Sequence, residues 1–419
     1  MKGKQVPFTK EQIEKIIETH PTPFHIYDEK AMLDYAQKFI DAFSWNEGFK
    51  EFYAIKACPN PHIMKLLYKK GFGIDASSYT ELELAERIGM RGEEIMFTSN
   101  DTTVAEYKKA KELGAVINLD DIKHIKYLEE NVGLPDLISF RYNPGALKDG
   151  NVIIGKPEEA KYGFTRPQIF EGFKILKEKG IKRFGLHTMV ASNELDYNYF
   201  IETAEILFDL IVEVKKELDI EFEFVNLGGG IGIPYKSEHP PVNLELMSAG
   251  IKEKYEQIVL GNGLSPIKIY FESGRAITGP FGYLVSEVLH IKETYKKYAG
   301  LDSCMANLMR PALYGSYHHI SVLGKREQPH ETIYDVTGSL CENNDKFAIN
   351  RFLPELEPGD LVVIHDTGAH GHSMGFNYNG KLRSAELLLR ENGDVKLIRR
   401  AETIEDIFST LDFDDANKL

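Results

Sequence analysis

The sequence predicts a (β/α)8 TIM-like barrel followed by a C-terminal, mostly antiparallel β domain. Over the first 279 residues, short apolar runs alternate with amphipathic segments of helical spacing. After about Gly279 the pattern changes to strands separated by turns. Because 419 residues exceed one ordinary core, we expect two domains, at residues 1–279 and 280–419. The first ~30 residues are candidates for packing on the β domain instead of the barrel.

Eight short runs predict the strands of the barrel, because they are rich in β-branched and aromatic residues. They are residues 52–55, 71–74, 95–97, 115–117, 137–140, 184–186, 222–225 and 267–271. Helices are predicted between them, at residues 61–68, 79–88, 104–113, 122–130, 167–178 and 197–218. Strands that alternate with helices run parallel. Eight such units suit a closed barrel, and an open, doubly wound sheet is the alternative.

Six further runs with strand character predict the β domain. They are residues 281–291, 318–323, 332–337, 361–365, 384–389 and 395–400. Pro358-Gly359-Asp360 and Asn392-Gly393-Asp394 mark turns between them. Near the N-terminus, Thr9 and Gln12 form the capping-box pattern that opens a helix.

The composition excludes some classes of function. The formal net charge is −14, which argues against a protein that binds nucleic acid through a basic face. The three cysteines, Cys58, Cys304 and Cys341, are too few for a disulfide framework and favour a reducing compartment. No apolar stretch approaches a signal peptide or a membrane span, so we expect a cytoplasmic protein without membrane contact.

Polar residues follow the predicted barrel strands, and barrel enzymes place their chemistry at the C-terminal strand ends. These residues are Lys56, Asp75, Asn118, Asp120, Arg141, His187, Glu272 and Arg275. Lys56 follows an apolar run, where the charged form of an amine is disfavoured and Schiff-base chemistry becomes possible. A strand-end lysine turned to solvent is the alternative.

Two loops rich in small residues predict a phosphate site. Residues 228–230, three glycines, and the loop 272–275 follow strands seven and eight, where barrels commonly bind phosphate. Simple tight turns are the alternative. Glu272 suits a basic ring nitrogen or a salt bridge to Arg275. His187 suits a group that stacks on a cofactor or holds its ring oxygen, and a buried core histidine is the alternative.

The β domain carries candidate substrate ligands. Arg310 with Tyr314 suits a carboxylate clamp. Cys341 suits a proton donor and Glu342 an ammonium ligand, although a lone Cys-Glu pair is usually structural. We expect no metal site, because the chain has neither paired cysteine clusters nor a His-Glu-x-x-His motif. Three histidines near the end of the chain do not change that expectation: His365, His370 and His372.

Together these segments resemble the pyridoxal-phosphate decarboxylases built on an alanine-racemase-like barrel, and among them the diaminopimelate decarboxylases. The resemblance covers nearly the whole chain, and its markers occur in order from Tyr53 to Ala369. They are Tyr53–Ala57, Asp75–Ser78 with Glu81-Leu82, Arg141–Pro144, Lys161–Gly163, Gly228–Gly230, Glu272–Arg275, Arg310–Tyr314, Gly338–Glu342 and Gly368-Ala369.

The resemblance implies pyridoxal 5′-phosphate as the cofactor, attached covalently to Lys56, with Glu272 paired to its ring nitrogen. The phosphate is expected on Ser192, Gly230 and the loop of Gly274 and Arg275. The full set of expected cofactor contacts is Lys56, Asp75, His187, Ser192, Gly229, Gly230, Glu272, Gly274, Arg275 and His370.

The resemblance also implies how a small amino-acid substrate is held. Arg275, Arg310 and Tyr314 would clasp its distal carboxylate, with Glu342 on its distal ammonium. Cys341 would protonate the carbon from which carbon dioxide departs. In such enzymes the residues at positions 341 and 342 reach the site from the partner subunit, so a homodimer is implied.

The sequence departs from the family pattern at four places near the site. Met189 stands where the family usually has a ring-stacking histidine, and His187 is the residue that would substitute. Ser273 replaces the proline of the usual Glu-Pro-Gly-Arg, which is a mild change. His370 replaces a tyrosine that contacts cofactor or substrate, and Cys58 replaces an asparagine.

The function implied is decarboxylation of meso-diaminopimelate to L-lysine in lysine biosynthesis. The first alternative is a related decarboxylase that acts on another amino acid, such as carboxynorspermidine or a carrier-bound substrate. The altered segment from His187 to Asn193 permits this. The second alternative is a non-catalytic pyridoxal-phosphate binder, against which the presence of both Lys56 and Cys341 argues.

Overall fold

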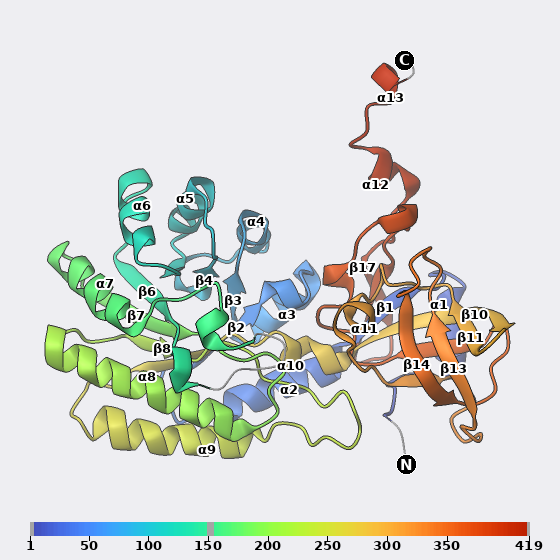
Figure 1. The fold of residues 1–419 in the computed structure, drawn as a ribbon, viewed down its shortest axis with the longest axis horizontal. Coiled ribbons are helices and arrows are strands. Elements are labelled where there is room, and N and C mark those ends of the chain that lie inside the picture. The colour runs from blue at the N-terminus through green and yellow to red at the C-terminus, as the bar shows by residue number, and fades with distance from the viewer. Residues whose placement is uncertain (1–3, 149–154, 417–419) are drawn as a thin grey trace. The chain divides into compact units, whose positions relative to one another are not determined.

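The computed structural model describes residues 4–148 and 155–416, and it divides into two compact units. The barrel unit comprises residues 33–234 and 240–277. The sheet unit comprises the chain up to Met32, residues 235–239, and the chain from Thr278 onward. Figure 1 shows the elements of both units. Among the residues described, no helix has the length and hydropathy needed to cross a bilayer.

Eight parallel strands close the barrel in chain order, which confirms the predicted (β/α)8 fold and excludes the open sheet. The strands are β2 (Lys50–Ala54), β3 (Gly73–Ala76), β4 (Ile95–Thr98), β5 (Val116–Leu119), β6 (Leu137–Tyr142), β7 (Arg183–Thr188), β8 (Phe224–Asn226) and β9 (Lys268–Phe271). The barrel closes between β9 and β2, where Glu51 is in register with Phe271. Because all eight strands run the same way, their C-terminal ends meet at one rim.

Helices α3 to α9 connect these strands on the outside of the barrel, while α2 precedes the first strand and α10 follows the last (Figure 1). These helices are α2 (Glu29–Ala42), α3 (Pro61–Lys69), α4 (Tyr79–Arg87), α5 (Val104–Leu113), α6 (Lys123–Asn131), α7 (Arg166–Glu178), α8 (Tyr197–Leu218), α9 (Leu244–Lys254) and the short α10 (Arg275–Thr278). Local signals set their starts. Thr103 and Glu106 form a capping box at α5, and Asn60 caps α3, which begins with Pro61.

The interior of the barrel begins with an apolar layer that contains one residue from each strand. Its members are Phe52, Gly73, Met96, Val116, Leu137, Gly185, Phe224 and Tyr270. The two glycines make room for two phenylalanines, because a Cβ at Gly73 would lie 2.5 Å from the Phe52 ring and one at Gly185 would lie 2.1 Å from the Phe224 ring. Each of these phenylalanine rings therefore fills the space beside a glycine, and the layer closes the bottom of the barrel as a packed plug.

The sheet unit contains a nine-stranded sheet that is mostly antiparallel, as the sequence predicts. Its strands are β1 (Phe24–Asp28), β10 (Gly282–Glu293), β11 (Lys297–Leu301), β12 (Ile320–Val322), β13 (Thr332–Thr337), β14 (Lys346–Leu353), β15 (Leu361–Ile364), β16 (Ala385–Leu389) and β17 (Val395–Arg399). The main path runs β14-β13-β11-β10-β1-β16-β17, while β15 pairs with β10 and β12. Strand β1 lies between β10 and β16 and is parallel to β16.

The helices of the sheet unit are short. They are α1 (Lys10–Ile17), α11 (Arg310–Tyr314), α12 (Ile404–Phe408) and α13 (Phe413–Ala416). Thr9 and Gln12 form the expected capping box at α1, whose Ile13 joins a core of the unit. The sequence does not predict β1, β11 or β14.

Candidate active site

Two residues beyond the apolar plug, the inward-facing positions of the barrel become mostly polar. We call these eight residues the polar layer. They are Ala54, Asp75, Thr98, Asn118, Ser139, His187, Asn226 and Glu272. Every one of them is buried. Burying this many polar groups costs stability unless they find hydrogen-bond partners, so the layer is where a ligand site is expected.

Both carboxylate oxygens of Glu272, in the polar layer, have hydrogen-bond partners. Its Oε2 lies 2.8 Å from His187 Nε2, and its Oε1 accepts a hydrogen bond of 2.7 Å from Asn226 Nδ2. Burial alone would raise the pKa of Glu272, but the His187 ring, with further help from Lys56 and Asn226, holds that pKa below its usual value. Glu272 is therefore kept ionised at the base of the site.

Lys56 and Asp75 complete a charged group with Glu272. Strand β2 ends at Ala54, and Lys56 follows in the 3-10 turn Ile55–Ala57 with an exposed side chain. Lys56 interacts electrostatically with both Asp75 and Glu272. Burial, together with the neighbouring Glu272, raises the pKa of Asp75 well above its usual value, and Lys56 opposes that shift.

Several buried polar atoms of this layer lack a hydrogen-bond partner among the described residues. They are Asp75 Oδ1, Asn118 Oδ1, Ser139 Oγ and His187 Nδ1. Buried donors and acceptors in folded proteins nearly always have partners. Four such atoms on four strands of one barrel indicate a place where a polar ligand or ordered water binds.

The glycine triplet after β8 lies against two neighbouring loops. A Cβ at Gly228 would lie 2.1 Å from the Thr188 carbonyl oxygen, and one at Gly229 would lie 2.3 Å from the Glu272 carbonyl oxygen. Gly228 and Gly230 have φ values of +71° and +95°, which glycine adopts without strain. Residues with side chains would push these loops apart, so the triplet keeps backbone groups close at the rim.

The loop after β9 approaches the Lys56 turn on one side and the loop after β7 on the other. A Cβ at Gly274 would lie 2.7 Å from the Ala57 Cβ. Arg275 is buried, and its Nη2 donates to Ser192 Oγ over 3.4 Å. The structure thus brings the predicted phosphate residues of the barrel unit to one part of the rim.

These features fit pyridoxal phosphate, the cofactor that the sequence resemblance implies. The ionised Glu272 suits a protonated ring nitrogen, and Lys56 suits an aldehyde carbon. The glycine triplet and Arg275 suit a phosphate. The unpartnered polar atoms of the layer offer further hydrogen bonds to a polar ring.

His187, which the sequence offers as a ring-stacking residue, contacts a carboxylate of the polar layer. Its fully buried ring forms a hydrogen bond with Glu272, another member of the polar layer, and so holds that carboxylate in place. Met189, two residues further along the chain, occupies the next inward position. Its Sδ accepts a hydrogen bond of 3.4 Å from the Gly229 amide, which places the thioether beside the glycine triplet.

The remaining predicted site residues belong to the sheet unit. Arg310 begins α11 and is buried, with its guanidinium 5.2 Å from the Tyr235 ring and 5.9 Å from the Tyr314 ring. Its Nη2 also donates to Ser316 Oγ over 3.2 Å. Tyr314 itself is exposed. An arginine buried among aromatic rings presents a fixed cation for a carboxylate.

Cys341 and Glu342 lie in the exposed connection between β13 and β14. The Cys341 amide donates to Asn379 Oδ1 over 2.9 Å, and its Sγ lies 3.5 Å from the Tyr378 hydroxyl. Hydrogen bonds with Tyr378 and then Asn379 lower the pKa of the Cys341 thiol. His370, the other predicted residue here, has a φ of +56°.

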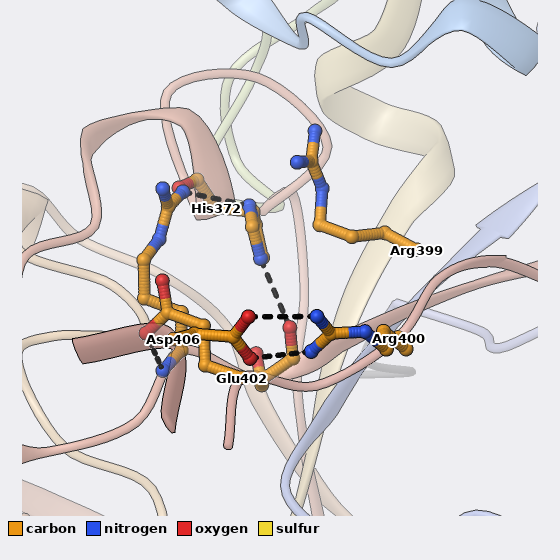
Figure 2. A pocket seen from close by; sticks show the side chains of 7 residues that line it. His372, Arg399, Arg400, Glu402 and Asp406 are labelled. Atoms are coloured by element: carbon orange, nitrogen blue, oxygen red, sulfur yellow. Dashed lines mark hydrogen bonds and ion pairs between the residues drawn. The ribbon is translucent and has the colours of Figure 1, made fainter. Parts of the chain in front are cut away.

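A separate cavity of the sheet unit is also rich in charge. Its volume is about 270 Å³, and its lining residues are His372, Arg383, Ser384, Arg399, Arg400, Glu402 and Asp406. Figure 2 shows Arg400 joined to Asp406 by two hydrogen bonds, which measure 2.5 and 2.7 Å. His372 Nε2 lies 3.0 Å from the Ser384 carbonyl oxygen. None of the predicted site residues lines this cavity.

Sequence reasoning missed Asn226, Thr98, Ser139 and Tyr378. Asn226 supports Glu272, and Thr98 accepts a hydrogen bond of 3.2 Å from Asn118. The signal for the barrel residues was available, because each stands two positions after a member of the apolar plug. Tyr378 carries no such signal, since it comes from a turn 37 residues from Cys341.

Comparisons with known proteins point to one family. The family model for the pyridoxal-dependent decarboxylases, pyridoxal binding domain, matches residues 31–279. Protein TabA of Pseudomonas amygdali pv. tabaci is 42% identical over 394 residues, covering 94% of this chain and 92% of that relative. The diaminopimelate decarboxylase of Methanothermobacter thermautotrophicus is 35% identical over 397 residues, covering 94% and 92%.

Solved structures agree with this result. A diaminopimelate decarboxylase from M. jannaschii, in co-complex with L-lysine, superposes with a TM-score of 0.87 at 30% identity, covering 96% of this chain and 94% of that one. The diaminopimelate decarboxylase of Helicobacter pylori, complexed with L-lysine, gives 0.86 at 28% identity, covering 97% and 100%.

Proposed function

The chain belongs to the pyridoxal-dependent decarboxylase family, and we propose that it converts meso-diaminopimelate to L-lysine and carbon dioxide. The enzyme is a pyridoxal-phosphate-dependent carboxy-lyase that acts on an amino acid. The observation that carries the choice of substrate is the similarity to diaminopimelate decarboxylases over 94% of the chain. The solved relatives with bound L-lysine, the proposed product, support it further.

The barrel residues have proposed roles toward the cofactor. When bound, pyridoxal phosphate supplies an electron-withdrawing ring that takes up the electrons released as the carboxyl group leaves. Lys56 would hold the cofactor covalently until substrate arrives. The ionised Glu272 keeps the ring nitrogen protonated, while His187 and Asn226 hold Glu272 in place. Asp75 lines the same mouth of the barrel.

The phosphate is proposed to bind at the rim between the glycine triplet and the loop after β9. Gly229, Gly230 and Gly274 allow close approach of the backbone, and Ser192 with Arg275 supply side-chain donors. Met189, beside the Gly229 amide, is proposed to lie against the ring face in place of the histidine usual in the family. His370 is proposed to contact the cofactor from the sheet unit.

The far end of the substrate needs residues for a second carboxylate and a second ammonium. Arg310 is proposed to bind the carboxylate, together with Arg275 and Tyr314, because a guanidinium pairs well with a carboxylate. Glu342 is proposed to bind the ammonium. A substrate that ends in both groups is chemically complementary to this set.

Cys341 is proposed to protonate the carbon that loses its carboxyl group. Its lowered pKa, which comes from hydrogen bonds with Tyr378 and Asn379, makes the thiol a stronger acid. We also propose that Cys341 and Glu342 act in the site of the partner subunit of a homodimer, as the family resemblance implies.

An assay of purified protein for lysine and carbon dioxide from meso-diaminopimelate tests the proposal. Activity only on ornithine or arginine would refute it. Arg310→Ala sharpens the test, because losing the partner of a buried carboxylate should cost ~3 kcal/mol, or on the order of 100-fold in kcat/KM. A substrate without a distal carboxylate should lose little from the same change.

A second candidate function is decarboxylation of another amino acid by the same machinery. Two observations favour it. Met189 stands where the family usually has a ring-stacking histidine, and Protein TabA, at 42% identity, does not carry the name of a diaminopimelate decarboxylase. Turnover of a different amino acid with a higher kcat/KM than meso-diaminopimelate would select this candidate.

A further inference from the structure

The loop after β9 is held on both sides by backbone contacts. On one side the Glu272 amide donates to the Gly228 carbonyl over 2.8 Å. On the other side the Ala54 amide of β2 donates to the Ser273 carbonyl over 3.4 Å, and Gly274 lies against Ala54 and Ala57. The position of this loop relative to Lys56 is therefore set by its contacts with β2.

Glu51 of β2 adds a third contact to this loop. Its Oε1 accepts a hydrogen bond from the backbone amide of Ser273. Both residues are 1% exposed, so water does not compete for this amide. An amide buried in this way must have an acceptor or lose much of its hydrogen-bond energy.

The acceptor is required because residue 273 is not a proline. The family resemblance carries Glu-Pro-Gly-Arg at this loop, and proline has no N–H to satisfy. A serine at this position introduces a donor into a buried setting. Glu51 belongs to the strand pairing that closes the barrel, in register with Phe271, and its carboxyl lies within hydrogen-bond distance of the Ser273 amide.

We propose that Glu51 is a positioning residue that fixes the cofactor-phosphate loop at Ser273–Arg275 by accepting the Ser273 amide. The inference rests on the proposed placement of the phosphate at this loop, and it does not depend on which amino acid is decarboxylated. Glu51 and Ser273 act as a pair, in which the buried serine amide makes the Glu51 acceptor necessary.

The hydrogen bond, and not a negative charge, performs this role. Burial raises the pKa of Glu51 well above its usual value, and the neighbouring Glu272 and Asp75 raise it further, against the Ser273 bond that lowers it. Tyr35, from α2, also interacts electrostatically with Glu51. A neutral carboxyl still accepts an N–H through its carbonyl oxygen, and an amide side chain does the same.

A double-mutant cycle on cofactor affinity tests the pair. Apoprotein is titrated with pyridoxal phosphate, and Kd is read from the absorbance change. Glu51→Leu should raise Kd ~10-fold by leaving a buried amide without an acceptor. Glu51→Gln should stay within ~2-fold of wild type, because it keeps the acceptor. In a Ser273→Pro background, Glu51→Leu should change Kd by less than ~2-fold, since no amide remains to be satisfied.

Two outcomes would overturn the proposal. The first is an unchanged Kd in Glu51→Leu. The second is an equal loss from Glu51→Leu in the serine and proline backgrounds, which would show that Glu51 supports the barrel without acting through residue 273. Far-UV circular dichroism and Tm identify any variant that fails to fold. If Glu51→Leu fails to fold with Ser273 present, it should still fold in the Ser273→Pro background, because no amide then needs an acceptor, and failure in both backgrounds would contradict the proposal.

A matched control is Glu223→Leu. Glu223 immediately precedes β8 and pairs with Arg183 over 2.5 Å, and it lies at the opposite end of the strands from the loop. Glu223→Leu should lower Tm without changing the Kd for the cofactor.

The proposed substrate is tested separately, by turnover. If the protein does not turn over meso-diaminopimelate but the double-mutant cycle on Kd gives the expected result, the proposed function is refuted and the role of Glu51 is not.

Discussion

Two clusters of charge in this chain are built differently, one in the cavity of the sheet unit and one at the mouth of the barrel. In the cavity of the sheet unit, both lining carboxylates have partners. Arg400 binds Asp406 with two hydrogen bonds (Figure 2), and Glu402 accepts from the Arg383 amide. Arg399, another lining residue, binds the neighbouring Glu386. Burial would raise the pKa of Glu386, but His372 and Arg399 lower it to about 2. Two buried atoms of the lining, Arg383 Nε and Ser384 Oγ, lack partners within the described residues, and neither belongs to a carboxylate.

At the barrel mouth, by contrast, the charges do not satisfy one another. Asp75 keeps an oxygen without a partner among the described residues, and its pKa is raised well above the usual value. Two carboxylates, Asp75 and Glu272, share one neighbouring amine, Lys56. The comparison teaches that internally paired charge contributes to structure, whereas charge left incompletely paired is reserved for a ligand.

The largest expected effect comes from removing the amine at the mouth. Lys56→Ala should abolish covalent retention of the cofactor and lower kcat on the order of 10³-fold or more. Borohydride reduction followed by peptide mass spectrometry should locate the cofactor on Lys56 in wild type and nowhere in the variant. Full activity of Lys56→Ala would show that the barrel mouth is not the catalytic site.

The same variant tests whether the proposed homodimer shares its active sites between subunits. Mixing Lys56→Ala with Cys341→Ala, each inactive alone, should form hybrids in which one site has both residues. A 1:1 mixture should therefore recover about a quarter of the wild-type activity, by random pairing of subunits. No recovery after verified subunit exchange would show that both residues act within one chain.

A smaller effect is expected from His187, which tunes the charge of the mouth. His187→Phe removes the neighbouring ring that lowers the pKa of Glu272, so that pKa should rise. Because Glu272 acts in its ionised form, which is present above its pKa and lost as pH falls through it, the acidic limb of the kcat/KM profile should move to higher pH. Cofactor absorbance over the same pH range gives a second readout.

An unchanged acidic limb in His187→Phe would contradict this account of Glu272. His187→Gln is the control, since an amide can still hydrogen-bond to the carboxylate while lacking a titratable ring. It should retain more activity than the phenylalanine variant. The pair of variants separates hydrogen bonding from charge at the base of the site.

The barrel was predictable because its signal is local. Phe52 and Phe224 mark strands by composition, and polar residues such as Asp75 and Glu272 follow at the strand ends. The strands missed in the sheet unit lack that signal. Strand β14 has charged and polar residues among its apolar ones, and its place is set by pairing with β13, which only the fold reveals.

The sequence indicates which residues belong to the site, but it does not indicate which contacts each of them makes. The sequence offered His187 as a stacking residue because it is the histidine nearest the family position. Its side-chain direction follows from strand alternation, which places it in the polar layer beside Glu272. The contact of Glu51 with Ser273 joins residues 222 positions apart, so no sequence pattern announces it.

The smallest effect is expected in the sheet-unit cavity, where the charges are paired. Asp406 lies in the first turn of α12 and pairs with the exposed side chain of Arg400. Asp406→Asn removes the negative charge of this ion pair. It also weakens the capping box in which Asp406 accepts from the Thr403 amide over 2.7 Å. Since exposed ion pairs contribute little, Tm should fall slightly while kcat/KM and cofactor Kd stay unchanged. A change in kcat/KM without a change in Tm would mean that this cavity communicates with the chemistry, and the distinction between paired and incompletely paired charge would not hold for this chain.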